Sequence, residues 1–536
     1  AYENELGERF IGATYYVSTA GSDSSNGLLT SPFNTIQRGV DAAWNGDTVI
    51  VYPGTYEGHI NFNNKSLVLA SRILESGDTT YVDSTIIEGI VTIGNAVDST
   101  ALFSGFTITG TYDSRGLDIL SDHNVLIEHV KVIGVGGVHV NNATVRLHDI
   151  MIKQNSRTDE GGGIKIYNST VELVNAVIDS NASTSNYGGG VSIQQSMVTM
   201  NEVEITNNTS SSSGGGIYNI GNNSVLNIAN SLISGNSSNS HGGGIHNDDD
   251  SELHLINVQV DHNSGTYGGG FANRGFYSAK RSTFNGNTAT GDHGGGIYSI
   301  GGNQNDTPDT LGQCIMQGNV AHGNGGGIML SSNQALHMVN TLVSDNTAGA
   351  VGGNNGRGGG IFAENGGQVG YSDFINCTIA NNSAFGSGSH YGGGFYNGDG
   401  NYRFTNTIIW HNQAIYNPNI GGPYDHVASN IGGDGSTLDT DPLFVDGKFN
   451  QKLREELKNT KAFSYIIDEK YGGMKLPVET QSRILVKLAS MNPSLGVTIM
   501  VPNSLGPGEL LQHYGTEEQK NKYLPKLVNS EYIPCF

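Results

Sequence analysis

A run of three glycines followed by an apolar residue recurs nine times and constrains the fold more than any other feature of this chain. The runs begin at Gly161, Gly188, Gly214, Gly242, Gly268, Gly294, Gly325, Gly358 and Gly392. Successive starts lie 26 to 34 residues apart. A repeat of this length is typical of stacked supersecondary units, because one unit cannot bury its apolar side alone. Most of the chain is therefore predicted to be a solenoid.

A second element recurs between the glycine runs: an apolar residue, two variable residues and an asparagine. The ten copies end at Asn155, Asn181, Asn208, Asn236, Asn263, Asn287, Asn319, Asn346, Asn382 and Asn412. Asparagine tolerates a turn conformation, and its amide can bond to the same residue in the units above and below. We expect a ladder of asparagines at one turn of every unit.

The residues between these marks have the periodicity of strands. Leu253, Leu255, Val258 and Val260 alternate with polar residues, and the space is too short for an amphipathic helix. Each unit is then a rung of two or three short strands, stacked in parallel about 4.8 Å from the next rung. The predicted fold class is all-β: a right-handed parallel β-helix with an N-terminal helical cap at residues 35–44, followed by a short all-α C-terminal segment.

The cysteines provide a check on this register. Cys314 and Cys377 each stand two residues before the apolar residue of a repeat copy, in a column of mostly small residues. We expect both to be buried, and two rungs separate them by roughly 9–10 Å, too far for a disulfide. Three cysteines in the chain indicate no disulfide framework.

Both ends of the repeat region carry recognisable motifs. The opening YYVSTAGSDSSNG, SPFNTIQRGVDAA and GDTVIVYPGTYEG resembles exported bacterial β-helix proteins of the pectate-lyase-like superfamily. The glycine and asparagine repeats are similar to those of polymorphic outer-membrane proteins and adhesins, and DTDPLFVDG resembles the segment that closes such helices. The resemblance covers residues 13–447, after a tail at 1–12, and implies an extracellular or outer cell-surface protein. It does not imply one activity, because this fold hosts lyases, hydrolases, adhesins and binding proteins.

Residues 448–536 differ in composition from the rest. Residues 1–447 hold 15 of the 27 Lys and Arg residues and 40 of the 49 Asp and Glu residues, a net charge of −25, whereas 448–536 carry a net charge of +3. Segments 471–473, 501–527 and 533–536 resemble the N-terminal helical domain of bacterial acyl-CoA dehydrogenases. Helices are expected at 449–461, 478–490 and 520–527, the last opened by a capping box of Thr516 and Gln519.

The dehydrogenase resemblance covers only the first part of that family's chain. The flavin-contacting β-domain and the helical domain with the catalytic glutamate have no counterpart in this sequence. We therefore expect no FAD site and no dehydrogenase activity, and an incomplete segment that derives from a truncated gene fusion or a junction artefact.

Charge and hydropathy exclude several partners. A net charge of −25 over residues 1–447 disfavours binding to nucleic acid or anionic membranes. No run of 18 apolar residues is present, so no membrane span is expected.

Aromatic and histidine residues flank the glycine runs and are the candidates for carbohydrate binding. They are Tyr187, Tyr218, His241, His246, Tyr267, His293, Tyr298, Tyr391 and Tyr396. Flat rings on a long surface suit stacking on sugars, and the alternative is that like residues stack on each other to stabilise adjacent rungs.

Acidic residues at one turn are the candidates for a metal site. Asp248, Asp249, Asp250 and Glu252 supply the oxygen ligands that calcium prefers, and the alternative is that they are solvated turn residues. A lyase would also need a Lys or Arg base, and a hydrolase two opposed carboxylates. No recognisable constellation of either kind stands out in the sequence.

These observations favour a secreted or cell-surface protein for adhesion or carbohydrate binding, with an extracellular polysaccharide or a host-cell glycan as its partner. A polysaccharide lyase or glycoside hydrolase is the alternative. An inactive acyl-CoA dehydrogenase-like protein is a third interpretation, based on the C-terminal segment alone.

Overall fold

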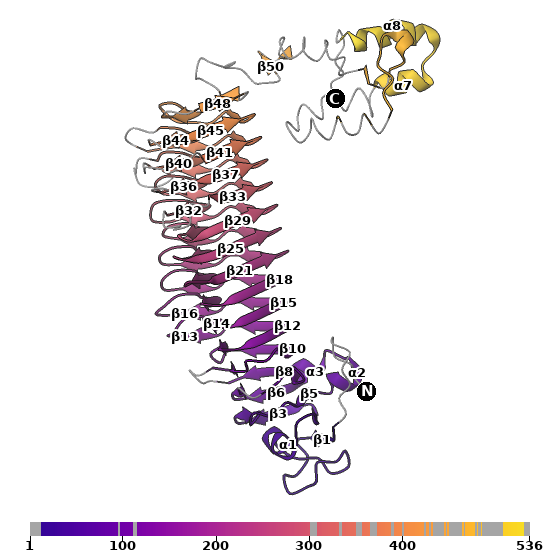
Figure 1. Cartoon of the computed structure of the whole chain (residues 1–536), viewed down its shortest axis with the longest axis vertical. Helices are drawn as coiled ribbons and strands as arrows, with labels where there is room; N and C mark the ends of the chain where they lie inside the picture. The colour runs from indigo at the N-terminus through magenta and orange to yellow at the C-terminus, as the bar shows by residue number, and fades with distance from the viewer. Residues whose placement is uncertain are drawn as a thin grey trace.

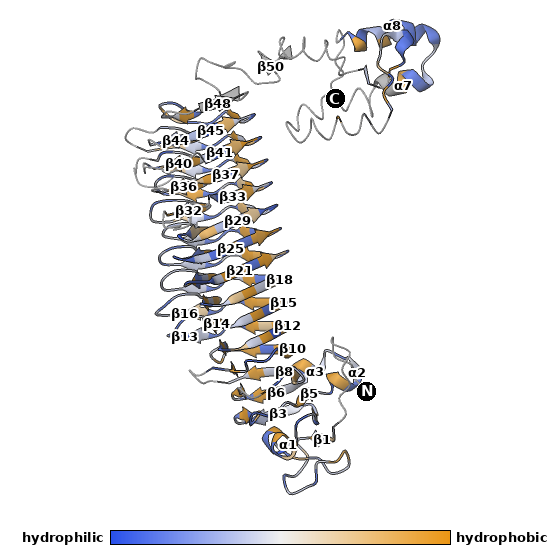
Figure 2. Cartoon of the chain, in the orientation of Figure 1, coloured by the Kyte–Doolittle hydropathy of each residue, from blue (hydrophilic) through white to orange (hydrophobic). Residues whose placement is uncertain are grey.

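The computed structural model describes most of the repeat region and parts of the C-terminal segment. The described residues are 12–94, 97–110, 115–300, 308–331, 335–349, 356–364, 372–386, 391–398, 401–422, 425–427, 430–431, 444–445, 448–449, 464–465, 467–477, 480, 484 and 507–529. The strands stack rung upon rung along one long axis (Figure 1). Hydrophobic positions recur at the same places on successive strands (Figure 2), as strand alternation in stacked rungs requires.

The stack consists of three sheets of parallel strands; sheets 1 and 2 begin near its N-terminal end, and sheet 3 begins at Ser156. Among the described residues, sheet 1 has 26 strands, sheet 2 has 14 and sheet 3 has nine. Parallel strands joined by crossovers within a sheet are almost always connected in the right-handed sense. The predicted right-handed parallel β-helix is confirmed.

Sheet 1 begins with the N-terminal strands and contains the longest strands of the molecule. Its strands are β1 (Thr14–Val17), β2 (Thr48–Val51), β3 (Gly54–Glu57), β5 (Val68–Ser71), β6 (Thr85–Glu88), β8 (Leu102–Thr109), β10 (Val125–Ile133), β12 (Thr144–Lys153), β15 (Thr170–Asp179), β18 (Met197–Thr206), β21 (Ser224–Ala229), β22 (Leu232–Ser234), β25 (Ser251–Ile256), β26 (Gln259–Asp261), β29 (Phe276–Lys280), β30 (Thr283–Asn285), β33 (Asp309–Gly312), β34 (Ile315–Gln317), β37 (Leu336–Val339), β38 (Leu342–Ser344), β41 (Ser372–Ile375), β42 (Thr378–Ala380), β45 (Tyr402–Thr405), β46 (Ile408–Trp410), β48 (Asp425–Val427) and β49 (Asn430–Ile431).

Sheet 2 follows the glycine runs. Its strands are β4 (Ile60–Asn61), β7 (Val91–Ile93), β9 (Leu117–Ile119), β11 (Val138–Asn141), β14 (Ile164–Tyr167), β17 (Val191–Gln194), β20 (Ile217–Ile220), β24 (Ile245–Asn247), β28 (Phe271–Asn273), β32 (Ile297–Ser299), β36 (Ile328–Leu330), β40 (Ile361–Ala363), β44 (Phe395–Asn397) and β47 (Ile420–Gly421). The apolar residue after each run points inward. These residues form one fully buried column: Ile164, Val191, Ile217, Ile245, Phe271, Ile297, Ile328, Ile361 and Phe395.

Sheet 3 follows the asparagine of each repeat and consists of two-residue strands. They are β13 (Ser156–Arg157), β16 (Ala182–Ser183), β19 (Thr209–Ser210), β23 (Ser237–Ser238), β27 (Ser264–Gly265), β31 (Thr288–Ala289), β35 (Val320–Ala321), β39 (Thr347–Ala348) and β43 (Ser383–Ala384).

The predicted asparagine ladder is present in all ten copies. In one rung, Asn208 donates from Nδ2 to the carbonyl of Ile178 at 2.9 Å and to Oδ1 of Asn236 at 3.0 Å. Its backbone amide also donates to Oδ1 of Asn236, at 2.9 Å. The same pattern continues to Asn412, whose Nδ2 donates to Asn419 at 3.0 Å. Each buried side-chain amide thereby satisfies two backbone groups of the preceding rung and bonds the asparagine side chain of the following rung.

Glycine is required at two positions of each run for different reasons. Gly242 has a φ of +65°, a left-handed conformation that glycine adopts without strain. A Cβ on Gly243 would lie 2.4 Å from the carbonyl oxygen of Gly269 in the next rung. The glycine runs therefore set how closely the rungs approach each other.

The cysteines lie as the register predicts. Cys314 and Cys377 are buried and free. Burial raises the pKa of Cys314 to about 11 and that of Cys377 to about 12, so both stay as neutral thiols.

A short helix closes the N-terminal end of the core. Helix α1 (Ile36–Ala42) begins after Thr35, whose side chain accepts a hydrogen bond from the backbone amide of Arg38. Its buried residues Ile36 and Val40 join the main core. The cap predicted at 35–44 is confirmed. Two further short helices, α2 (Ile73–Ser76) and α3 (Tyr81–Ser84), interrupt sheet 1 and were not predicted.

The described C-terminal pieces have a small core of their own. They include a hairpin of β50 (Phe444–Val445) and β51 (Lys448–Phe449), the 3-10 helix η2 (Glu469–Tyr471), α7 (Pro507–Tyr514) and α8 (Glu517–Val528). Helix α8 confirms the helix predicted at 520–527 and opens with the expected capping box. The core is formed by Ile467, Tyr471, Leu524, Leu527 and Val528. The helices predicted at 449–461 and 478–490 fall almost entirely outside the described residues. Across the described residues, no helix has the length and apolar character needed to cross a membrane.

Candidate functional site

The outward side chains of sheet 2 form ordered columns on one face of the β-helix. Strand register aligns the second residue of each strand into a middle column: Lys165, Ser192, Tyr218, His246, Ala272, Tyr298, Met329, Phe362 and Tyr396. Backbone hydrogen bonds align the residue before each glycine run into a flanking column, which includes Tyr187, His241, Tyr267 and His293. On the other side lie Asp248 and Arg274, directly after β24 and β28. We call this surface the sheet-2 face.

Seven of the nine predicted ring residues touch one another in a continuous cluster, which we call the aromatic ribbon. Its members are Tyr187, Tyr218, His241, His246, Tyr267, His293 and Tyr298. The ring centroids of Tyr187 and Tyr218 are 4.5 Å apart, with an interplanar angle of 13°. Those of His241 and Tyr267 are 5.0 Å apart. Parallel stacking brings the members of these two pairs together although they are 31 and 26 positions apart in sequence.

The other two predicted residues belong to a second ring cluster. Tyr396 stacks on Phe362 with centroids 5.2 Å apart, and Tyr391 stacks on Tyr416 at 5.5 Å. The guanidinium of Arg357 lies 5.4 Å from the ring centre of Tyr396. The sequence did not indicate Tyr416, because it follows no glycine run.

The rings of the aromatic ribbon present their edges more than their faces. Tyr218 and His246 are each only 3% exposed, and the remaining members are half-buried. Stacked neighbours cover the ring faces, as expected if these residues stack on each other to stabilise adjacent rungs. A ligand would therefore contact the rims of Tyr187, His241, Tyr267, His293 and Tyr298, which carry phenolic hydroxyls and imidazole nitrogens. Tyr218 and His246 lie beneath as support.

A polar cluster lies beside the ribbon. The Tyr218 hydroxyl donates to Oδ2 of Asp248 at 2.7 Å, and Oδ1 of Asp248 lies 3.9 Å from both His246 and Arg274. Burial and the charge of Asp248 raise the pKa of Tyr218, so its phenol stays protonated. Burial lowers the pKa of His246 to about 3, so its ring is neutral.

Several buried polar atoms on this face have no hydrogen-bond partner in the described structure. They are both ring nitrogens of His246, Nε of Arg274 and Oγ of Ser192. Buried polar groups in proteins are nearly always paired, so such atoms mark places where water or a ligand group completes the network.

The four acidic side chains predicted as metal ligands do not come together around one point. Asp248 is engaged by Tyr218, and Glu252 lies 3.5 Å from Nε2 of His254. Asp250 is exposed in a left-handed turn, and burial together with Asp248 raises the pKa of Asp249. The described residues include no group of three or more His, Cys, Asp or Glu side chains that could hold a metal ion. The calcium site stays a prediction from sequence.

Charged groups that sequence reasoning did not assign extend the same face. Lys165 lies 3.0 Å from Asp159 and 3.4 Å from Glu160, and Gln194 donates to Glu160 at 2.8 Å. The sequence feature that could have pointed to these charged groups is the acidic pair just before the first glycine run. A separate groove of about 380 Å³ lies where α3 meets sheet 1, with Lys131 bonded to Asp83 at its rim. It was missed because α2 and α3 are too short to show helical periodicity.

Two family models match parts of the chain. The acyl-CoA dehydrogenase N-terminal domain matches residues 440–531, and the Chlamydia polymorphic membrane protein repeat matches residues 202–220 and 281–300. An acyl-CoA dehydrogenase of Bacillus subtilis (strain 168) is 30% identical over 70 residues, which are 13% of this chain and 18% of that relative. The chain thus spans less than a fifth of the curated relative it matches. Both resemblances expected from the sequence are confirmed.

Solved structures with related architecture are distant. Pectate lyase Pel9A has a TM-score of 0.33 at 15% identity, covering 62% of this chain and 75% of its own. A mannuronic acid specific polysaccharide family 6 lyase from human gut microbiota has a TM-score of 0.33 at 12% identity, covering 78% and 89%. PfbA, a surface adhesin of Streptococcus pneumoniae, has a TM-score of 0.22 at 11% identity, covering 74% and 86%. Because these TM-scores and sequence identities are low, the β-helix assignment depends on the strand pairing of this chain itself.

Proposed function

We propose that this protein is an extracellular or cell-surface β-helix that binds carbohydrate on its sheet-2 face. The observation that carries the proposal is the aromatic ribbon, in which Tyr187 through Tyr298 place seven rings in unbroken contact. Rings with polar edges suit sugars, because one residue offers both an apolar surface and a hydrogen-bonding group. The partner is an extracellular polysaccharide or a glycan on a host cell.

The arrangement suits a ligand that lies along the solenoid axis. Rungs repeat about every 4.8 Å, so the ribbon offers polar edges at regular intervals along its length. His246 and Arg274 have buried nitrogen atoms without partners in the described structure, and ordered water would link these atoms to a ligand at the centre of the ribbon. Recognition would then be mainly by hydrogen bonds to sugar hydroxyls from the side, with ring stacking restricted to exposed ring surfaces.

The test is binding of the full chain to a glycan array, followed by titration calorimetry with the best ligand. The double variant Tyr267→Ala/Tyr298→Ala should bind at least about tenfold more weakly, since central aromatic contacts dominate binding energy. Trp44→Ala is the matched control, because Trp44 is 77% exposed on the N-terminal cap. Unchanged affinity in the double variant, with an unchanged melting temperature, would contradict the proposal. Tyr218 is unsuitable for this test, because its burial couples it to stability.

A polysaccharide lyase or glycoside hydrolase is the second candidate. The observation that favours it is the presence of Lys165 and Arg274 beside carboxylates on the same face. A lyase makes unsaturated products that absorb in the ultraviolet, so incubation with uronate polysaccharides separates the two functions. We expect no rise in absorbance and no new reducing ends.

For the C-terminal segment we propose no dehydrogenase activity, and a boundary with the β-helix near residues 447–448. The family match is to the N-terminal domain alone, at residues 440–531. Purified protein should be colourless; a flavin spectrum that stays with the protein through purification would contradict this.

A further inference from the structure

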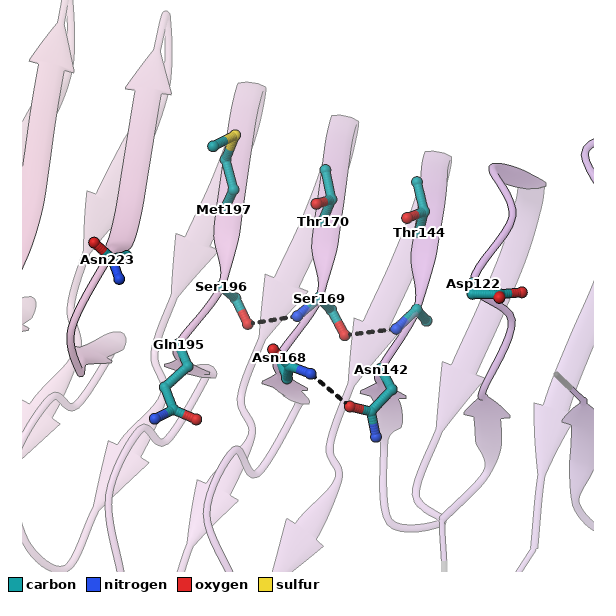
Figure 3. A pocket seen from close by; sticks show the side chains of 11 residues that line it. Asp122, Asn142, Thr144, Asn168, Ser169, Thr170, Gln195, Ser196, Met197 and Asn223 are labelled. Atoms are coloured by element: carbon teal, nitrogen blue, oxygen red, sulfur yellow. Dashed lines mark hydrogen bonds between the residues drawn. The ribbon is translucent and has the colours of Figure 1, made fainter.

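An open groove runs along the corner between sheets 2 and 1 (Figure 3), and none of its described lining residues belongs to the aromatic ribbon. It has a volume of about 380 Å³ and crosses successive rungs from Asp122 to Asn223. Four spacings of about 4.8 Å separate those two rungs, which gives a length of about 19 Å.

Every rung of the groove except that of Asp122 has the same three-residue pattern at the corner. A left-handed amide residue comes first, as in Asn168 with a φ of +45° and Gln195 with a φ of +48°. A buried small residue follows, and then an outward residue that begins the sheet-1 strand, such as Thr170 or Met197. The left-handed residue turns the chain at the corner, so that its side chain and the outward residue two positions later line one groove.

Hydrogen bonds between rungs hold these side chains in register. Oγ of Ser169 accepts from the backbone amide of Ala143 at 3.0 Å, and Oγ of Ser196 accepts from the backbone amide of Ser169 at 3.0 Å. Nδ2 of Asn168 donates to Oδ1 of Asn142 at 2.6 Å (Figure 3). The floor is thus ordered before any ligand arrives, which lowers the entropy cost of binding.

Other polar groups of the groove remain available. The side-chain hydroxyls of Thr144 and Thr170 and the side-chain amides of Gln195 and Asn223 have no hydrogen-bond partner among the described residues. Hydroxyl and amide groups both donate and accept, as sugar hydroxyls do. Met197 is 56% exposed in the same groove and offers an apolar surface to the C–H side of a sugar ring.

Charge restricts the class of ligand. The described residues that line the groove include no Lys or Arg, and one of them is the acidic Asp122. An anionic ligand would meet no counter-charge here and would be repelled by Asp122. We propose that the corner groove is a binding site for a neutral oligosaccharide that lies along the solenoid axis. This site is separate from the sheet-2 face and does not depend on the function proposed there.

The first experiment observes the groove directly by NMR of the full chain with 13C-methyl-labelled methionine. Met197→Leu identifies the Met197 methyl signal among the nine methionines of the chain. The probes are cellohexaose, chitohexaose, maltohexaose and xylohexaose, with hexagalacturonate as the anionic comparison. We expect at least one neutral hexasaccharide to shift the Met197 signal saturably and hexagalacturonate to leave it unmoved. No shift with any neutral probe, or an equal shift with hexagalacturonate, would overturn the proposal.

The second experiment uses substitutions that keep shape and strand propensity. Thr144→Val with Thr170→Val removes two hydroxyls and should weaken binding of the active hexasaccharide about tenfold, at about 1 kcal/mol for each lost hydrogen bond. Thr199→Val is the matched control, because Thr199 is exposed on the same strand as Met197 but outside the groove. Affinity that falls equally in the control would overturn the assignment.

A comparison with the ribbon variant separates the two proposals. The Tyr267→Ala/Tyr298→Ala variant should retain the ligand-induced shift of the Met197 methyl group. If that shift disappears in the ribbon variant and persists in the Thr144→Val/Thr170→Val variant, the groove proposal is wrong and the sheet-2 face is the site.

Discussion

Substitution of one ladder asparagine by alanine should destabilise the β-helix strongly, and Asn236 is the best position for this test. Its side chain is 1% exposed in the middle of the stack. Nδ2 donates to the carbonyl of Ile205 at 2.8 Å and to Asn263 at 3.0 Å. Oδ1 accepts from the backbone amide of Asn208 at 2.9 Å and from its side chain at 3.0 Å.

The magnitude follows from these four contacts. Asn236→Ala removes all of them and leaves the buried backbone amide of Asn208 without a partner. Oδ1 of Asn263 keeps only the bond from the backbone amide of residue 236, and Nδ2 of Asn208 keeps only its bond to Ile178. At about 1 kcal/mol per bond, with the unpaired buried amide adding to the cost, the loss is about 4 kcal/mol. Domains are typically stable by only about 5–15 kcal/mol, so the change would be large.

Chemical denaturation followed by circular dichroism measures the effect. We expect a lower midpoint with an unchanged slope, which indicates lost stability and an unaltered folded state. Asn227→Ala is the matched control: Asn227 is half-buried in the same rung, has no side-chain hydrogen bond in the described structure, and should change stability by less than about 0.5 kcal/mol. A loss below about 1 kcal/mol for Asn236→Ala would refute the view that the ladder contributes to stability.

Three further predictions concern glycine, pH and thiols. Gly243→Ala should lower the melting temperature markedly, because its Cβ would lie 2.4 Å from a backbone oxygen. Gly312→Ala should have little effect, because no atom lies within 4 Å of the added Cβ. Equal effects of the two substitutions would contradict the packing argument. Burial would raise the pKa of Asp179, but hydrogen bonds from its neighbours lower it to about 2. The stability that this carboxylate contributes is therefore present above about pH 4 and lost as pH falls towards about 2. Asp179→Asn should flatten this pH dependence of stability, as measured by urea titrations at several pH values. Cys314 and Cys377 should resist thiol reagents until the β-helix unfolds, because burial raises their pKa to about 11 and 12; peptide mass spectrometry that finds them labelled in native protein would contradict their placement.

The features that sequence predicts well are those that stacking repeats in every rung. The asparagine ladder and the burial of Cys314 and Cys377 follow from register alone, because parallel rungs place like positions above one another. The N-terminal cap was predictable for a local reason: Thr35 begins a short amphipathic segment that buries Ile36 and Val40.

The candidate site was only partly predictable. The sequence placed Tyr218 in a column of rings, but its burial depends on the position of the Tyr187 ring and on the hydrogen bond to Asp248. Register does not fix such side-chain conformations. The corner groove gave no signal, because an Asn or Gln followed by Ser and Thr, as at Asn168, resembles any turn. The groove forms only when several such turns are stacked.

The nearest-neighbour bonding of the rungs also bears on how the chain can change over evolutionary time. Each ladder asparagine bonds only to adjacent rungs, and so does each strand of sheet 2. Duplication or deletion of the codons for one whole repeat, often 26 to 28 residues here, would leave every remaining bond with an equivalent partner. Recombination between repeats could thus lengthen or shorten the recognition surface by one rung at a time, and relatives should differ in length by multiples of a repeat.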